Sequence, residues 1–447
     1  MRKVLRGIKL EHKKNTMDCA TEYLPTPNEV RISMSQHIGA SCEPLVAVGD
    51  TVKIGQKIGD TDAFVSAPVH SSVSGKVTSI ERIMSIQGTY DPMVTIRTDG
   101  KHERWEGLEP PTVNTREEFV AAVRESGIVG LGGAAFPASV KYSPKNLAEV
   151  NTLIINGAEC EPYITSDYRT MIEQADDVVK GTEIVMKHLE MERAYIGIES
   201  NKPKAISLLE ELTKDKPIDV VRLRSLYPKG AERVLIYEIS GKALPAGKLP
   251  ADVGVLVSNV TSIAAVAHYF TTGNPLTRKR ITVDGDAVAD PKNIMAPIGT
   301  KIYEIVAFCG GYKAQPSKLL MGGPMMGRSI YDDGKPIIKN NNAILALSEK
   351  EVSKIGHETQ CINCGRCVDN CPIELMPTTI MRAYERGDAE DLKALNVGVC
   401  MECGCCAYVC PARKPLSLLN RMAKAFLAES ERKAAEAAKA AEERGDE

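Results

Sequence analysis

Two cysteine runs near the end of the chain constrain its fold more than any other feature. Nine of the thirteen cysteines lie between Cys361 and Cys410, and eight of them form the pattern C-x2-C-x2-C-x3-C-P twice. A cubane 4Fe-4S cluster needs four converging thiolates, three from a tight loop and one from the start of a helix. Zinc sites more often show two separated C-x2-C pairs, and disulfides need an oxidising compartment that nothing in the chain indicates. The doubled run therefore predicts two 4Fe-4S clusters.

The spacing also predicts which cysteines share a cluster. In two-cluster runs of the bacterial ferredoxin type, the fourth cysteine of each run ligates the cluster of the other run. The first cluster is therefore assigned to Cys361, Cys364, Cys367 and Cys410. The second cluster is assigned to Cys400, Cys403, Cys406 and Cys371. Cys405 is surplus and is interpreted as a packed neighbour. The stretch between the runs predicts helix interrupted at Gly387.

The length and the net charge of the chain limit the number of domains and the classes of partner that can be expected. A chain of 447 residues is too long for one core at about 100–200 residues per domain, so three or four modules are expected. Its 56 basic and 58 acidic residues give a charge of −2, which offers no basic field for nucleic acid as a partner. No signal-peptide pattern opens the sequence, and no run of about 18 apolar residues occurs. Neither export nor a membrane span is therefore expected.

The middle of the chain alternates short apolar runs with helical patterns. The expected strands are 152–156 (TLIIN), 194–198 (AYIGI), 219–223 (DVVRL) and 254–258 (GVLVS). The expected helices are 167–189, 204–212 and 232–239. This alternation predicts a parallel, doubly wound sheet. Ligands of such sheets bind beyond the carboxyl ends of the strands, where this chain has Asn, Glu and Gly residues.

A glycine-rich stretch precedes the first of these strands. Gly130, Gly132 and Ala135 fit the pattern G-x-G-x-x-A. The preceding residues 116–126 predict a helix, whereas a nicotinamide-binding fingerprint requires a strand at that place. Two interpretations are left: a loop whose backbone N–H groups approach a phosphate, and a flexible turn.

The flanking segments predict smaller modules. Residues 44–80 contain short β-rich pieces separated by glycines, as in a biotinyl- or lipoyl-like sandwich, but no lysine lies at the tip, so a structural role is expected. His70 in this module is interpreted as an ordinary loop histidine. Residues 280–311 predict a hairpin around 284–286 and a helix near 301–307. The loop 321–327 (MGGPMMG) could serve packing or contact with a partner, and the tail from about 425 predicts a solvated helix rather than a coiled coil.

Four stretches in order carry a family resemblance: GLGGAAFPASVKYSP, INGAECEP, YPKGAERVLI and SNVTSIAAVA. Together they resemble the flavin- and NADH-binding subunit of respiratory complex I. The resemblance implies non-covalent FMN, with NAD(H) as substrate above its ring, and Glu161 and Glu232 as the catalytic-site carboxylates that orient the nicotinamide or ribose. Ala158 and Ala231 stand where complex I usually has acidic residues, and Leu131 replaces its arginine. The implied cofactor-binding residues are Gly130, Gly132, Lys141, Asn156, Glu159, Tyr227, Gly230, Asn259 and Thr261.

The order of modules resembles the RnfC subunit of the Rnf electron-transport complexes. That resemblance implies a multidomain α/β chain: an N-terminal barrel-sandwich module (1–110), an FMN/NADH-binding domain (111–275), a β-grasp domain (276–345), a helical two-cluster ferredoxin domain (346–425) and a charged helical tail (426–447). It further implies an NAD(H)-facing subunit of an ion-translocating ferredoxin:NAD oxidoreductase, peripheral on the cytoplasmic side of the membrane. Other membrane subunits would be its partners, and ferredoxin would be reached through one of them. Two alternatives are kept: a relay or scaffold without flavin catalysis, and a flavoprotein related to cobalamin reductase.

Overall fold

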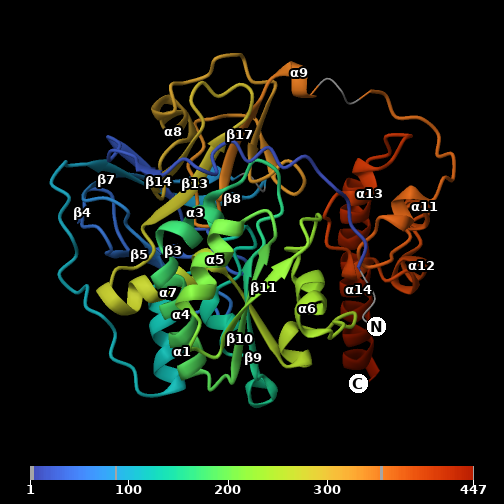
Figure 1. Ribbon diagram of the computed structural model, residues 1–447, viewed down its shortest axis with the longest axis horizontal. Coiled ribbons are helices and arrows are strands. Elements are labelled where there is room, and N and C mark those ends of the chain that lie inside the picture. The colour runs from blue at the N-terminus through green and yellow to red at the C-terminus, as the bar shows by residue number, and fades with distance from the viewer. Residues whose placement is uncertain (1–4, 86–87, 353–355, 446–447) are drawn as a thin grey trace. The chain divides into compact units, whose positions relative to one another are not determined.

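The computed structural model describes residues 5–85, 88–352 and 356–445 (Figure 1). The chain forms two compact units, each described here by itself. The larger unit contains Glu11–Ser225 and Pro250–Ser353. The smaller unit combines the N-terminal segment as far as Leu10 with Leu226–Leu249 and with the C-terminal part from Lys354. Neither unit is therefore a single continuous stretch of sequence.

The first part of the larger unit consists of two small antiparallel sheets around one apolar core. Both sheets bury one face in this core. Their strands alternate buried valine or isoleucine with more exposed residues, so one side of each strand faces the core. The short β-rich pieces predicted for this region are confirmed. One sheet contains, in spatial order, β2 (Glu29–Ser33), β8 (Tyr90–Thr98), β7 (Gly75–Met84) and β4 (Thr51–Val52). The other contains β3 (Glu43–Pro44), β5 (Lys57–Asp60) and β6 (Val69–His70).

A four-stranded parallel sheet forms the centre of the larger unit. Three of its strands are largely apolar and buried because both faces of the sheet are covered, whereas the fourth, at one edge, exposes Asp219 and Arg222. The four strands predicted from the sequence are confirmed to within one residue at each end. In spatial order they are β11 (Ile218–Leu223), β10 (Arg193–Glu199), β9 (Thr152–Gly157) and β12 (Val255–Asn259).

Helices pack against this sheet in one continuous core. The first begins with a capping box, in which the Thr115 hydroxyl accepts from the Glu118 N–H while the Glu118 carboxylate accepts from the Thr115 N–H. The helix predicted at 167–189 is interrupted at Gln174, whose φ of −131° and ψ of 36° are not helical. The helices and turns are α1 (Arg116–Glu125), α2 (Ala138–Lys141), η1 (Leu147–Glu149), α3 (Ser166–Glu173), α4 (Ala175–His188), α5 (Pro203–Leu212), η2 (Pro250–Val253) and α7 (Val260–Thr272).

A mixed six-stranded sheet completes the larger unit. The predicted hairpin is confirmed, since β13 pairs antiparallel with β14, and the predicted helix near 301–307 is α8 (Ile302–Phe308). An N-terminal strand adds itself in parallel to β14, which local pattern did not predict. The spatial order is β1 (Thr21–Tyr23), β14 (Lys292–Pro297), β13 (Arg278–Asp284), β17 (Ala343–Leu347), β15 (Lys318–Met321) and β16 (Arg328–Ile330), and α9 (Glu349–Val352) follows.

The smaller unit is helical where it is regular. The break predicted at Gly387 is confirmed: this glycine has φ of 68° and separates α11 from α12. The predicted tail helix is also confirmed, but it begins nine residues earlier than expected, at Leu416. The elements are α6 (Glu232–Ser240), α10 (Arg366–Asp369), α11 (Pro377–Glu385), α12 (Ala389–Ala394), η3 (Val397–Val399), α13 (Cys405–Tyr408) and α14 (Leu416–Gly445).

Candidate functional site

The strand order of the parallel sheet defines where a ligand can bind in the larger unit. Numbered along the chain, the strands lie in the order 3-2-1-4, so the connections reverse direction between β9 and β12. Such a switch point opens a crevice beyond the carboxyl ends of the two strands. The last residue of β12, Asn259, is the register partner of Asn156 in β9. Two predicted site residues are thus adjacent at the switch point.

The glycine-rich turn lies against the same strand end. A Cβ on Gly132 would approach the Asn259 Nδ2 to 2.7 Å, so only glycine fits there without displacing the asparagine. The turn is tied to the start of α7, because the Leu131 N–H donates to the Ser262 hydroxyl at 2.9 Å. Gly132 and Gly133 are exposed, and Gly133 has φ of +113° with open space where a Cβ would stand. The turn therefore offers accessible backbone at the crevice, a few residues before Lys141 at the end of α2.

The side chains at the start of α7 form a closed hydrogen-bond set with Asp167. The Asn259 Oδ1 caps α7 by accepting from the Thr261 and Ser262 N–H groups. The Asn259 Nδ2 donates to Asp167 at 2.7 Å, and the Thr261 hydroxyl donates to the other Asp167 oxygen at 2.6 Å. Sequence reasoning missed Asp167, because its only local signal is an acidic residue in the first turn of a helix.

A buried lysine, Lys14, hydrogen-bonds to the acidic loop that follows β9 and contains Glu159 and Glu161. The Glu159 carboxylate accepts from the Asp167 and Tyr168 N–H groups and so caps α3. The Lys14 ammonium donates to the carbonyls of Glu159 and Glu161, each at 2.9 Å, and lies 3.8 Å from the Glu159 carboxylate. Burial raises the pKa of Glu159 and lowers the pKa of Lys14, because desolvation penalises both charges. No pattern near Lys14 predicted this contact.

Glu161 contacts the methionine-rich loop between β15 and β16. Its carboxylate accepts from the Met325 N–H at 3.0 Å and from the Met326 N–H at 2.8 Å. Burial raises the pKa of Glu161 to about 7, against the opposing effect of these two hydrogen bonds. The sequence left open what the loop 321–327 does. In the structure it packs on the predicted nicotinamide-orienting carboxylate.

The crevice fits an anionic, phosphate-bearing cofactor on its own chemistry. The glycine turn is exposed at Gly132 and Gly133, and the Asn340 amide donates to the Gly133 carbonyl at 2.9 Å. Close to this region, the Lys279 ammonium is buried with no hydrogen-bond partner in the described part of the chain, and its electrostatic neighbours are Asp167 and Glu159. Burial lowers the pKa of Lys279 to about 8. The same unit thus holds an exposed glycine turn and an unpaired buried cation, whose charged neighbours are Asp167, Arg280 and Glu159, and both suit an anionic cofactor such as FMN.

Three further predicted residues belong to the smaller unit. Tyr227 is buried, and its hydroxyl donates to the Cys403 carbonyl at 2.7 Å. Gly230 lies in the turn before α6, and Glu232 is the first residue of that helix. The structure thus groups these residues with the cysteine loops rather than with β9 and β12.

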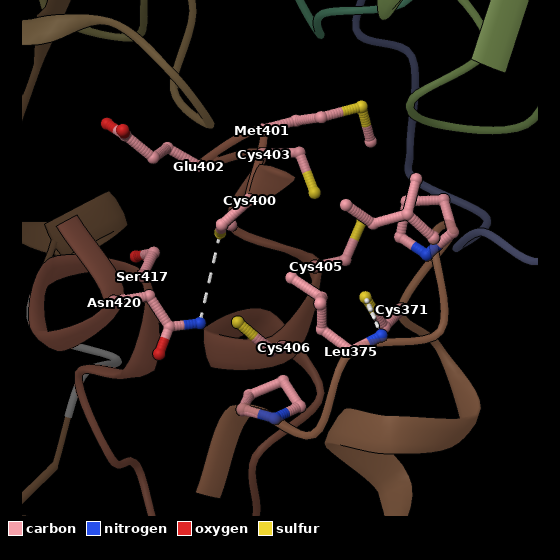
Figure 2. Close-up of a pocket in the computed structure, with 14 residues that line it drawn as sticks. Cys371, Leu375, Cys400, Met401, Glu402, Cys403, Cys405, Cys406, Ser417 and Asn420 are labelled. Carbon is pink, nitrogen blue, oxygen red and sulfur yellow. Dashed lines mark hydrogen bonds between the residues drawn. The ribbon is translucent and has the colours of Figure 1, made fainter. Parts of the chain in front are cut away.

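Four cysteines of the smaller unit that belong to one predicted set line the same pocket. They are the set expected for the second cluster, Cys371, Cys400, Cys403 and Cys406, and Figure 2 shows their sulfur atoms around a common space. Cys405 also lines the pocket and is buried. The Leu375 N–H donates to the Cys371 Sγ at 3.3 Å, a bond that suits a thiolate. Four soft thiol donors around one space fit an iron–sulfur cluster.

The other set has three cysteines in the first loop of the repeat and one, Cys410, at the end of the second run. Cys367 is buried, and Cys410 packs in the same small apolar cluster. Cys361 and Cys364 lie in the preceding loop, where Asn363 has φ of 54°. Within the described ranges, no three His, Cys, Asp or Glu side chains are placed to hold a single metal ion. A cubane with thiolates at its corners needs a wider arrangement than one ion does.

A flavin-type crevice and two cysteine loops in one chain define an iron–sulfur flavoprotein of electron transfer. Comparison with known families agrees part by part. Residues 2–101 match the RnfC barrel sandwich hybrid domain, residues 123–268 the Nuo51 FMN-binding domain, residues 280–329 the SLBB domain, and residues 354–411 the 4Fe-4S dicluster domain.

Two relatives are similar over most of their length. Each is the subunit designated C of its complex. The chain is 43% identical over 374 residues to that of the proton-translocating ferredoxin:NAD(+) oxidoreductase complex of Clostridium ljungdahlii, covering 83% of this chain and 81% of that protein. It is 40% identical to the Na(+)-translocating counterpart of Acetobacterium woodii, covering 84% and 85%. The chain belongs to the RnfC family of subunits of the ion-translocating ferredoxin:NAD(+) oxidoreductase complexes.

A solved structure shares the fold. An NAD+-reducing [NiFe]-hydrogenase in the H2-reduced state superposes with a TM-score of 0.51 at 17% identity, over 70% of this chain and 63% of that one. Among the helices in the described part of the chain, none is both long and apolar enough to span a bilayer.

Proposed function

We propose that this subunit exchanges hydride between NAD(H) and a non-covalently bound FMN, and relays single electrons through two 4Fe-4S clusters. One observation carries the proposal: the exposed glycine turn meets the paired Asn156 and Asn259 at the switch point of a parallel sheet. When bound, a flavin supplies the link between the electron pair of NAD(H) and the single electrons that clusters accept.

The residues of the larger unit have distinct tasks in this proposal. The backbone at Gly130 and Gly132, with Lys141, holds the FMN phosphate. Asn156, Asn259 and Thr261 form the floor of the crevice beneath the ring. Glu159 fixes the acidic loop by capping α3, and Glu161 orients the nicotinamide or ribose. Hydride transfer between NADH and a flavin needs no strong base on the substrate, so these carboxylates position rather than move protons.

The smaller unit has the cluster ligands. We assign one cluster to Cys361, Cys364, Cys367 and Cys410, and the other to Cys371, Cys400, Cys403 and Cys406. Tyr227 supports the second loop through its bond to the Cys403 carbonyl. Gly230, in the turn before α6, is proposed to contact the cofactor, and Glu232 is the second carboxylate proposed to orient the substrate.

The module boundaries and the setting of the subunit follow from the family. We propose a biotinyl- or lipoyl-like sandwich over 1–110, the FMN/NADH domain over 111–275, a β-grasp domain over 276–345, the dicluster domain over 346–425 and a charged tail over 426–447. The relatives are named as subunits of proton- and Na(+)-translocating complexes. In this proposal the chain is peripheral on the cytoplasmic side, its partners are the membrane subunits, and ferredoxin reacts through one of them.

An anaerobic mixing experiment tests the proposal. The purified full chain, with reconstituted clusters and added FMN, is mixed with NADH while flavin and cluster absorbance are followed. We expect flavin bleaching and then cluster reduction. Gly132→Val should weaken FMN binding roughly tenfold or more, since its side chain would displace Asn259. Glu161→Gln should slow the NADH step, whereas Glu117→Gln, an exposed carboxylate of α1, should not.

A relay without flavin catalysis is the second candidate. It is favoured by the hydrogen bonds that already engage Asn259, Glu159 and Glu161 within the chain. Ala158 and Ala231 also stand where complex I has acidic residues. If FMN is lost on washing and NADH changes nothing while dithionite reduces two clusters, the relay role is established and the flavin proposal fails.

A further inference from the structure

The two halves of the cysteine region repeat each other at an offset of 39 residues, beyond the cysteines themselves. Asn363 and Glu402 hold φ values of 54° and 56°, and Gly365 and Gly404 hold 75° and 79°. Such left-handed residues at matching places give both loops the same backbone path. Each loop therefore supplies an internal reference for the other.

Side-chain contacts repeat at the same offset. The Arg382 guanidinium donates to the Asn363 Oδ1 at 2.8 Å, and Arg421 donates to the Glu402 carboxylate at 2.7 Å. In both halves, a helix after the fourth cysteine thus ties down the loop between the first and second cysteines. The first helix is α11 and the second is the beginning of α14.

One buried position breaks the repeat. The first half has Met381, which packs in the apolar cluster around Cys367. The second half has Asn420 at the matching place, where its Nδ2 lies 3.9 Å from the Cys400 Sγ, the contact dashed in Figure 2. Asn420 is 1% exposed, and its Oδ1 has no hydrogen-bond partner in the described part of the chain.

A buried amide with an unpaired oxygen costs stability, so packing alone does not account for an asparagine where the repeat has a methionine. The chemistry of the ligand sulfur determines which end of the Asn420 amide faces it. An iron-bound thiolate carries lone pairs and no proton, so it accepts hydrogen bonds and favours the N–H side of the amide. The amide dipole then points its positive end at the cluster.

We propose that Asn420 is a positioning residue that raises the reduction potential of the cluster held by Cys371, Cys400, Cys403 and Cys406 above the value a methionine would give. Reduction adds one electron, and hence one negative charge, to a cluster. An N–H donor at a ligand sulfur stabilises the more negative, reduced form. The proposal rests on the proposed function, whose cysteine sets it uses, and it orders the two clusters along the relay.

The test is a redox titration of the full chain with dithionite, followed by electron paramagnetic resonance of both clusters. Asn420→Met should lower one midpoint by a tenfold change in the one-electron reduction constant, which is about 59 mV, and leave the other in place. Met381→Asn should raise the other midpoint instead. If Asn420→Met leaves both midpoints unchanged, or moves both equally, the proposal is overturned.

Cluster content keeps this result separate from the failure of the wider proposal. Iron and sulfide assays of the unaltered chain establish whether two clusters bind at all, and fewer than two would refute the assigned cysteine sets before any midpoint is compared. Where Asn420→Met loses its cluster, Met381→Asn carries the test. An unchanged midpoint in a fully loaded Met381→Asn chain would then overturn the role of the amide.

Discussion

A buried ion pair beside the acidic loop makes a sharp prediction about stability. The Lys202 ammonium lies 3.3 Å from the Glu199 carboxylate and donates to the Ala158 carbonyl at 2.6 Å. The side chains of Lys202 and Glu199 are 0% and 1% exposed. We expect Lys202→Met to destabilise the larger unit strongly, because the change leaves a buried carboxylate without its cation.

The magnitude follows from what each group loses. Breaking a buried pair by removing one partner costs about 3–5 kcal/mol. A buried carbonyl left unpaired, here that of Ala158, costs about 1–3 kcal/mol. Adding Glu199→Leu to Lys202→Met removes the uncompensated charge and leaves only the neutral oxygens that Lys202 contacted, those of Ala158, Glu159 and Asn201. The double variant should therefore be more stable than Lys202→Met by about 2 kcal/mol or more.

Urea unfolding followed by the fluorescence of Trp105, the single tryptophan, measures both variants because Trp105 lies in the larger unit. The matched control is Lys204→Met, which changes an exposed lysine of α5 that pairs only at the surface, and it should leave the urea midpoint nearly unchanged. A loss below about 1 kcal/mol for Lys202→Met, or a double variant less stable than the single, would refute the reasoning.

Three further predictions use the same unfolding assay or its pH dependence. Gly181→Ala in α4 should add about 1 kcal/mol to the free energy of unfolding through helix propensity. It should lose more than that, because its Cβ would stand 2.1 Å from the Ile263 carbonyl of α7. A net gain in stability would contradict this prediction. Thr115→Ala should cost about 1 kcal/mol by removing the cap of α1, and an unchanged urea midpoint would argue against the capping box. Because burial raises the pKa of Glu161 from 4.5 to about 7, the folded chain holds a proton that the unfolded chain releases. The resulting stability is present below pH 4.5 and lost as the pH rises through 7. Glu161→Gln should flatten that slope, which urea midpoints across this range would reveal.

The sequence predicted correctly those strands that short-range hydrophobic patterns determine. Three of the parallel strands are largely apolar runs, β11 alternates apolar with charged residues, and the sequence predicted all four to within a residue at each end. The interruption of the helix at Gln174 was not predicted, because no glycine or proline marks it. Helix propensity gives no sign of this break, since glutamine is a good helix former.

Long-range contacts account for what the sequence did not predict in the site. Lys14 reaches the acidic loop across 145 residues, and a lysine read in isolation is most often a surface residue. Asp167 is one acidic residue among many in first turns of helices. Tyr227 follows β11 closely in sequence, yet its hydroxyl contacts the loop of Cys403. Cysteine spacing predicted the repeated loops, whereas the role of Asn420 emerges only when the halves are compared.

The discontinuity of the smaller unit has a consequence for how it is made. Ile8 and Tyr227 exchange two backbone hydrogen bonds, of 2.8 and 3.0 Å, and Tyr227 in turn supports the Cys403 loop. Both of these segments precede the cysteine runs in the sequence, so synthesis from the N-terminal side delivers them before the cluster ligands. A fragment that begins after residue 353 would contain all eight proposed ligands but lack both supports. The cluster-bearing part is therefore not an independent module, because its loops are supported by segments that come much earlier in the sequence.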